Sequence, residues 1–175
     1  MQLRSLCQSI LGAALVGLVA GCATAPPPPA EPQRPLPAVQ ATSPARPAQS
    51  EQGNEVTIYA LGLLNTGYRF GGKNPDAGLD CSGMVSYIYE RAAGLRLKGS
   101  AADIARQGRA VERTQLRLGD LVFFNTRNAP YSHVGIYIGG QRFVHAPSSN
   151  GKVRIDLLSN SYFAQRFEAA RTYFD

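Results

Sequence analysis

The chain has 175 residues, of which 44% are hydrophobic and 17% are charged, so it can form one globular domain with appendages. Its net charge is +6, but the basic residues are scattered and do not alternate with aromatic residues in any cluster. This pattern argues against a nucleic acid partner. It favours a basic solvated surface, with weak attraction to an anionic polymer or membrane surface as the alternative.

The first 21 residues are typical of a secretory signal peptide. Arg4 supplies the positive start, and the apolar run from Leu6 to Val19 is too short to cross a membrane comfortably. Residues 19–22, Val-Ala-Gly-Cys, resemble the bacterial lipoprotein box. That resemblance implies cleavage before Cys22, acylation of Cys22 and anchoring in a lipid bilayer. The alternative is a soluble-secretion signal followed by a chance cysteine.

The residues after the acylated cysteine predict a location and a tether. Ala23, rather than an aspartate, follows Cys22, which in a two-membrane bacterium resembles the pattern sorted to the outer membrane. We therefore expect the protein on the periplasmic face of that membrane. Residues 22–53 hold nine of the twelve prolines and too few large apolar residues to bury a core. They predict a disordered linker with local polyproline II structure.

Residues 54–175 are expected to fold as one domain that is helical in its first half. Apolar residues at helical spacing predict a first helix at 55–66. The glycine-rich stretch 68–79 predicts a loop. Two further helices are predicted at 81–93 and 101–107, because each has a capping residue before it and a glycine after it.

The second half changes to short apolar and β-branched runs separated by turn residues, which is the pattern of strands. The predicted strands are 120–124, 134–138, 142–146, 153–157 and 167–174, with a helical turn at 159–165. Helices followed by antiparallel strands predict an α+β fold, in which N-terminal helices pack on a C-terminal antiparallel sheet.

Cys81 is the one cysteine outside the leader region, because Cys7 and Cys22 lie within or beside it. Asp80 is a suitable N-cap, so the thiol falls in the first turn of the predicted helix. Unpaired backbone N–H groups and the positive end of the helix dipole lower the pKa of such a thiol. We therefore predict that Cys81 is a nucleophile.

His133 and His145 are the only histidines, and a short hairpin joins the strands that carry them. A two-residue turn would put the two rings on opposite faces of the sheet, whereas an odd-length loop or a bulge would put them on the same face. We predict the second arrangement, with the helix of Cys81 packed against that face. His133 is then the base for the thiol, and His145 orients His133.

Each of these residues also has a purely structural interpretation. A lone buried cysteine can be a small core residue, and two histidines at hairpin spacing can be ordinary surface residues. One cysteine and two histidines could also bind zinc, but the sequence has no second closely spaced pair of ligands. We expect neither a metal nor another cofactor.

Five landmarks, in order, resemble those of the NlpC-type family of bacterial cell-wall cysteine peptidases. They are Tyr-Arg-Phe-Gly-Gly at 68–72, Leu-Asp-Cys-Ser-Gly at 79–83, Leu-Gly-Asp-Leu-Val-Phe-Phe at 118–124, Ser-His-Val-Gly-Ile-Tyr-Ile-Gly at 132–139 and Phe-Val-His-Ala at 143–146. The resemblance covers residues 54–175 and implies a compact papain-like α+β domain. It places the nucleophile on Cys81, the base on His133 and the third polar residue on His145. Tyr68, Asp80 and Ser82 fall where relatives contact the substrate peptide.

The resemblance also implies an activity. It is the hydrolysis of amide bonds in peptidoglycan stem peptides or their cross-links, through a thioacyl-enzyme. The bond cleaved, the preferred stem peptide and the oligomeric state cannot be read from these residues. The alternative function is a non-catalytic binding or scaffold lipoprotein, anchored in the envelope, on the same fold.

Overall fold

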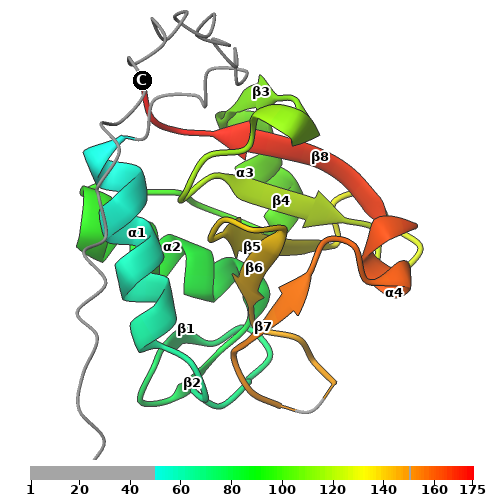
Figure 1. Ribbon diagram of the computed structural model, residues 1–175. Coiled ribbons are helices and arrows are strands. Elements are labelled where there is room, and N and C mark those ends of the chain that lie inside the picture. The colour runs from blue at the N-terminus through cyan, green and yellow to red at the C-terminus, as the bar shows by residue number, and fades with distance from the viewer. Residues whose placement is uncertain (1–49, 150) are drawn as a thin grey trace, which may run out of the picture. The chain divides into compact units, whose positions relative to one another are not determined.

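A computed structural model describes residues 50–149 and 151–175 (Figure 1). The predicted signal peptide, Cys22 and almost all of the predicted linker lie outside these residues. The elements in chain order are α1 (Glu51–Gly62), β1 (Lys73–Asn74), β2 (Gly78–Leu79), α2 (Cys81–Ala93), α3 (Ala101–Gln107), β3 (Arg109–Val111), the 3₁₀ turn η1 (Arg113–Gln115), β4 (Leu121–Phe124), β5 (His133–Tyr137), β6 (Arg142–His145), β7 (Arg154–Leu157), α4 (Ser161–Ala164) and β8 (Phe167–Thr172). Within the described residues, no helix has the length and apolar character needed to cross a membrane.

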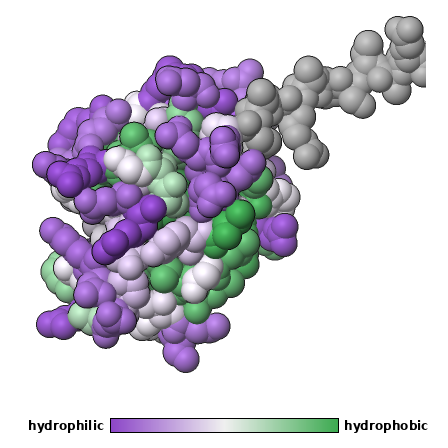
Figure 2. Space-filling model, turned by 90° about the vertical axis from the view of Figure 1, so that its left-hand side faces the viewer, coloured by the Kyte–Doolittle hydropathy of each residue, from purple (hydrophilic) through white to green (hydrophobic). Residues whose placement is uncertain are grey.

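Helix α1 begins at Glu51, four residues before the predicted start, and ends at Gly62 rather than at 66. The cause is Ser50, whose side chain accepts a hydrogen bond from the N–H of Gly53 and caps the helix. Residues 51–53 are therefore helical. Helix α1 buries Val56 and Ala60, whereas other apolar side chains on it stay exposed. Figure 2, which views the molecule from the left-hand side of Figure 1, shows an apolar band within a mostly hydrophilic surface.

Helices α2 and α3 have the predicted bounds because their ends are capped. The side chain of Asp80 accepts from the N–H of Gly83 at the start of α2, and Gly94 ends that helix in the left-handed conformation, with φ 69°. Ser100 and Asp103 form a reciprocal capping box at the start of α3.

The sheet has six antiparallel strands in the order β3-β8-β4-β5-β6-β7. The strands predicted in the second half are present, with ends shifted by one or two residues. Strand β3 was missed because it is only three residues long and mostly exposed, and pairing with the C-terminal strand β8 defines it. The predicted loop at 68–79 contains the two-stranded sheet of β1 and β2.

Alternate residues of the central strands enter two separate cores. One face carries Val134, Ile136 and Val144, which pack with apolar residues of α1 and α2. The other face carries aromatic residues of β4 and β6, which pack against α4 and β8. The long N-terminal helices α1 and α2 packed on one face of an antiparallel sheet confirm the predicted α+β fold.

Candidate active site

The hairpin between β5 and β6 has the predicted odd length. Ile136 pairs with Val144, and the N–H of Ile138 donates to the carbonyl of Arg142, which leaves the three residues 139–141 in the turn. This register puts both histidine rings on the same face of the sheet. His133 Nε2 lies 2.8 Å from His145 Nδ1, so the two rings are hydrogen-bonded.

Gly135 lies between the two histidines and makes their contact possible. It is directly opposite His145 across the two strands. A Cβ atom at this position would lie 2.5 Å from Phe143 Cδ2 and 3.3 Å from the Cβ of His145. Only glycine leaves the rings of Phe143 and His145 where they are.

Asp156 on β7 continues the chain of hydrogen bonds behind His145. Its Oδ2 lies 2.7 Å from His145 Nε2 and accepts a second hydrogen bond, of 2.8 Å, from Arg154 Nε. The sequence analysis missed this residue. The available signal was the alternation of polar Arg154 and Asp156 with apolar Ile155 and Leu157, on a strand following that of His145.

The hydrogen bonds assign the tautomer of each ring. The Asp156 carboxylate can only accept, so His145 Nε2 carries the proton and His145 Nδ1 is an acceptor. His133 Nε2 must then donate to His145 Nδ1. The remaining nitrogen, His133 Nδ1, therefore keeps a free lone pair that can take a proton.

Burial keeps both rings uncharged near neutral pH. It lowers the pKa of His133 to about 3, and the nearby charges of Arg127 and Arg154 act in the same direction. Burial also lowers the pKa of His145, although the hydrogen bond to Asp156 opposes this shift. The bonds from His145 and Arg154 lower the pKa of Asp156, which stays ionised.

Cys81 is the first residue of α2, as predicted, but its pKa does not move as predicted. Burial, and then the charge of Asp80, raise the pKa of the thiol, whereas the backbone N–H groups of Val134 and Ser82 lower it less strongly. The expectation of a lowered pKa is wrong because Cys81 is only 8% exposed and the charge of Asp80 acts on its thiol. At neutral pH the free site holds a thiol rather than a thiolate.

The position of α2 also differs from the prediction. The helix packs on the face of Val134 and Ile136, whereas the rings of His133 and His145 lie against Phe124, Phe143 and Phe163 on the other face. The thiol lies at the start of β5, where the Val134 N–H faces it. Among the described residues, no hydrogen bond joins the thiol to His133. Such contacts are often long in the absence of substrate.

Two hollows lie beside these residues. One, of about 400 Å³, is lined by Cys81 and by all three residues predicted to bind substrate, Tyr68, Asp80 and Ser82. The other, of about 280 Å³, is lined by His133, His145 and Asp156. Arg127, on the loop between β4 and β5, lines both hollows.

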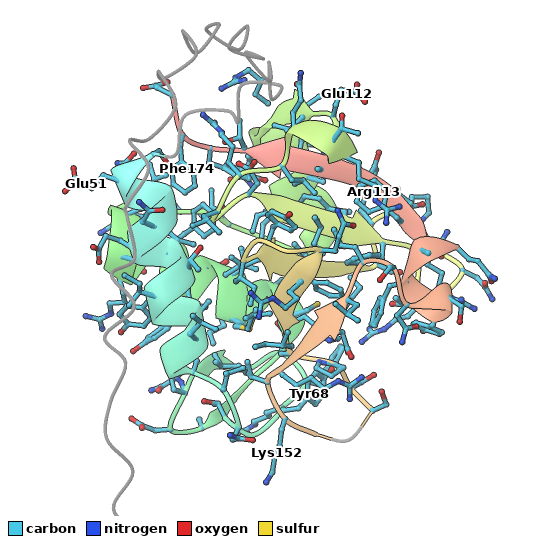
Figure 3. The ribbon with its side chains drawn as sticks, in the orientation of Figure 1. Glu51, Tyr68, Glu112, Arg113, Lys152 and Phe174 are labelled. Atoms are coloured by element: carbon cyan, nitrogen blue, oxygen red, sulfur yellow. The ribbon has the colours of Figure 1, made fainter. Side chains whose placement is uncertain are left out.

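The structure shows how the residues that line the thiol hollow are held. The two carboxylate oxygens of Asp80 accept from the N–H of Gly71, the hydroxyl of Ser82 and the N–H of Gly83. Asp80 is therefore a helix cap that also lines the hollow. The N–H of Tyr68 donates to the carbonyl of Gly151. Figure 3 shows Tyr68 and Lys152 near each other at the end of the domain that carries β1 and β2.

The two histidines have few ring nitrogens left for a metal ion. Both ring nitrogens of His145 are used, one by His133 and the other by Asp156. In residues 50–149 and 151–175, no group of three or more histidine, cysteine or acidic side chains could hold a metal ion.

A sequence profile of the NlpC/P60 family matches residues 65–172, which include all of these site residues. The chain belongs to the NlpC/P60 family. Solved structures with this fold include the NlpC/p60 domain of the peptidoglycan hydrolase SagA, with a TM-score of 0.60 and 30% identity over 69% of this chain and 97% of that one. An NlpC/P60 family protein of Bacillus cereus has a TM-score of 0.66 and 26% identity, covering 74% of this chain and 42% of that one.

Several curated relatives are named as enzymes. Murein DD-endopeptidase MepS/Murein LD-carboxypeptidase of Escherichia coli K12 is 40% identical over 104 residues, which are 59% of this chain and 54% of that protein. Gamma-DL-glutamyl hydrolase of Bacillus subtilis is 39% identical over 107 residues, 61% of this chain and 26% of that protein. The match thus spans from about a quarter to about half of the length of these relatives.

Proposed function

We propose that this protein is a cysteine peptidase that hydrolyses amide bonds in peptidoglycan stem peptides or their cross-links. The observation that carries the proposal is the line of hydrogen bonds from Asp156 through His145 to His133, which leaves His133 Nδ1 free as a base. Membership of the NlpC/P60 family and the names of the curated relatives support peptidoglycan as the substrate.

In the proposed first step, His133 Nδ1 takes the thiol proton while Cys81 Sγ attacks the carbonyl carbon of the substrate amide. The first backbone N–H groups of α2 lack partners within the helix and stabilise the oxyanion. His133 then gives the proton to the leaving nitrogen, and the C–N bond breaks to leave a thioester on Cys81. A water molecule, deprotonated by His133, hydrolyses the thioester and restores the thiol.

The ionisation of the free site shapes this mechanism. A neutral thiol beside a neutral imidazole favours proton transfer during the attack over an ion pair formed beforehand. His145 would stabilise the imidazolium of His133, and the Asp156 carboxylate would share that charge through His145. Asp156 therefore has a positioning role, and Tyr68, Asp80 and Ser82 bind the part of the substrate on the acyl side.

We also propose that the enzyme is a lipoprotein. Acylated Cys22 would anchor it in the bilayer, on the periplasmic face of the outer membrane in a two-membrane host, and residues 22–49 would serve as a tether. Metabolic labelling with a palmitate analogue tests this point. Label should enter the wild-type protein and be lost from Cys22→Ala; a labelled Cys22→Ala protein would disprove the anchor.

The enzymatic proposal is tested by incubating the purified chain with defined muropeptides and reading the products by mass spectrometry. Wild-type protein should give products that differ from the substrate by the addition of one water, and Cys81→Ala should give none. A brief acid quench should reveal an acyl adduct on Cys81. Intact muropeptides with the wild-type protein would disprove the proposal and favour a non-catalytic scaffold.

A further inference from the structure

The two hollows at the active site differ in the charges of the side chains that line them. The thiol hollow has one acidic side chain, Asp80, and one basic side chain, Arg127, so its formal charges balance. The histidine hollow has two guanidinium groups, Arg127 and Arg154, and one carboxylate, Asp156. With His133 and His145 neutral, the histidine hollow carries a net positive charge.

Of these two arginines, Arg127 has the guanidinium that remains available. Arg154 donates to Asp156 and to the carbonyl of Ser149. The hydrogen bonds and ion pairs of residues 50–149 and 151–175 include none from the side chain of Arg127, which is exposed. Its charge nevertheless lowers the pKa of both Cys81 and His133, so the guanidinium lies within electrostatic reach of both.

The backbone of Arg127 is fixed even though its side chain is free. The hydroxyl oxygen of Ser132 accepts from the N–H of Thr126, at 2.9 Å, and from the N–H of Arg127, at 3.1 Å. A loop held in this way fixes the point from which the Arg127 side chain extends, and Arg127 lines both hollows. The backbone therefore does not have to be ordered again when a ligand binds.

The proposed chemistry assigns a side of the substrate to each hollow. His133 must give its proton to the leaving nitrogen, so the leaving fragment lies on the side of the thiol that His133 lines. We infer that the histidine hollow is a subsite for the leaving fragment, in which Arg127 binds a free carboxylate of that fragment. A guanidinium suits this task because its planar fork can hold both carboxylate oxygens.

This inference rests on the proposed function, but it can be tested by binding alone. The probes are the stem peptide L-alanyl-γ-D-glutamyl-diaminopimelyl-D-alanine and analogues in which one carboxylate at a time is amidated. Each probe is titrated calorimetrically against the full chain carrying Cys81→Ala, and against the same chain with Arg127→Gln, Arg127→Lys or Arg96→Gln added. Arg96 is an exposed arginine that pairs with Glu90 and lines neither hollow, so it is the matched control.

One amidation should weaken binding to the Cys81→Ala protein roughly tenfold, because a charge-assisted hydrogen bond is lost. Arg127→Gln should remove that difference, Arg127→Lys should keep part of it, and Arg96→Gln should keep all of it. The same difference in the Arg127→Gln protein, or no measurable binding to any of these proteins, would overturn the inference.

The products of the wild-type enzyme check the assigned side independently. The carboxylate that depends on Arg127 should lie in the fragment that leaves with the new amine, and a carboxylate in the acyl fragment would overturn the assignment. If the wild-type protein cleaves nothing, the proposed function fails. In that case the calorimetric titrations still decide whether the subsite exists, because they measure whether the effect of amidating one carboxylate depends on Arg127.

Discussion

The two faces of the central sheet perform different tasks with neighbouring residues of the same strands. Val134 and Ile136 of β5 face the helical side, in the core shared with α1 and α2, whereas His133 faces the opposite, histidine side. On that side, Phe124, Phe143 and Phe163 surround the histidine rings with apolar surface, which lowers the pKa of each ring. The comparison shows that neighbouring residues of one strand can serve different purposes, one packing the core and the next facing the candidate site.

The strongest test of this separation compares two neighbours on β5. His133→Gln should reduce kcat by about 10³-fold, because the general base is lost, while the free energy of unfolding changes little. Val134→Ala should instead lower the free energy of unfolding by about 1–3 kcal/mol and leave kcat within a few-fold. Muropeptide turnover and urea unfolding measure the two effects. An equal decrease in the free energy of unfolding in His133→Gln and Val134→Ala would contradict the claim that the two faces have different tasks.

Acid should lower the free energy of unfolding through the two buried histidines. The folded-state pKa of His133 is about 3, against an ordinary value of 6.5, so the unfolded chain binds the proton first. The free energy of unfolding is therefore unaffected by His133 above about pH 6.5 and decreases as the pH falls towards 3, by up to about 1.4 kcal/mol per pH unit. His145, whose pKa is also lowered, adds to the same loss. Urea unfolding between pH 7 and 4 should show a shallower loss for His133→Gln, and equal slopes would contradict the assignment.

Gly135→Ala should disturb the histidine side of the sheet and leave the helical side in place. The new methyl group would push against Phe143 and His145, at a cost of about 1–3 kcal/mol in stability, and kcat should fall because the histidine rings shift. Gly62→Ala on α1 is the control, since a Cβ there meets nothing within 4 Å. Unfolding and turnover are measured together; unchanged kcat in Gly135→Ala would show that ring positions tolerate the shift.

Asp156→Asn should act on the chemistry alone. The amide cannot stabilise the imidazolium as a carboxylate does, and it can reverse the tautomer of His145. We expect kcat to fall roughly tenfold with KM nearly unchanged, because Asp156 acts through two rings. Asp76→Asn, an exposed acid that lines neither hollow, is the control. A change confined to KM would indicate contact with substrate instead of positioning.

Ser50→Ala should have the smallest effect and should leave the site untouched. Loss of the N-cap of α1 costs about 1 kcal/mol of stability, and kcat should not change. Thermal unfolding and turnover measure this. A fall in kcat would mean that the helical side and the histidine side are coupled more closely than their packing indicates.

Local signals explain which parts of the fold could be predicted from the sequence. Asp80, Ser100 and the glycines after both helices fixed the ends of α2 and α3, because capping depends on residues within one turn. Ser50 was missed because it follows a proline-rich stretch that predicts a linker. Strand β3 could not be predicted, since pairing with a strand some 60 residues later defines it.

The same division applies to the site. Cys81, His133 and His145 could be proposed from the sequence because their residue types are chemically reactive and the spacing of the two histidines is local. The fourth member, Asp156, depends on which strand pairs with β6, and a short sequence window does not contain that information. The direction of the shift in the Cys81 pKa was mistaken for a related reason. A helix start lowers a thiol pKa, but burial against the rest of the domain decides the outcome.

The three-residue turn at 139–141 has a consequence for engineering this protein. Whether the number of residues in this turn is odd or even decides whether the His133 and His145 rings lie on the same face of the sheet and can form their hydrogen bond. Deleting or inserting a single residue there would turn β6 over, so that His145 faced the helical side and Val144 took its place on the histidine side. Adding two residues would preserve the pairing. Peptides inserted into this hairpin should therefore add an even number of residues, whatever their sequence.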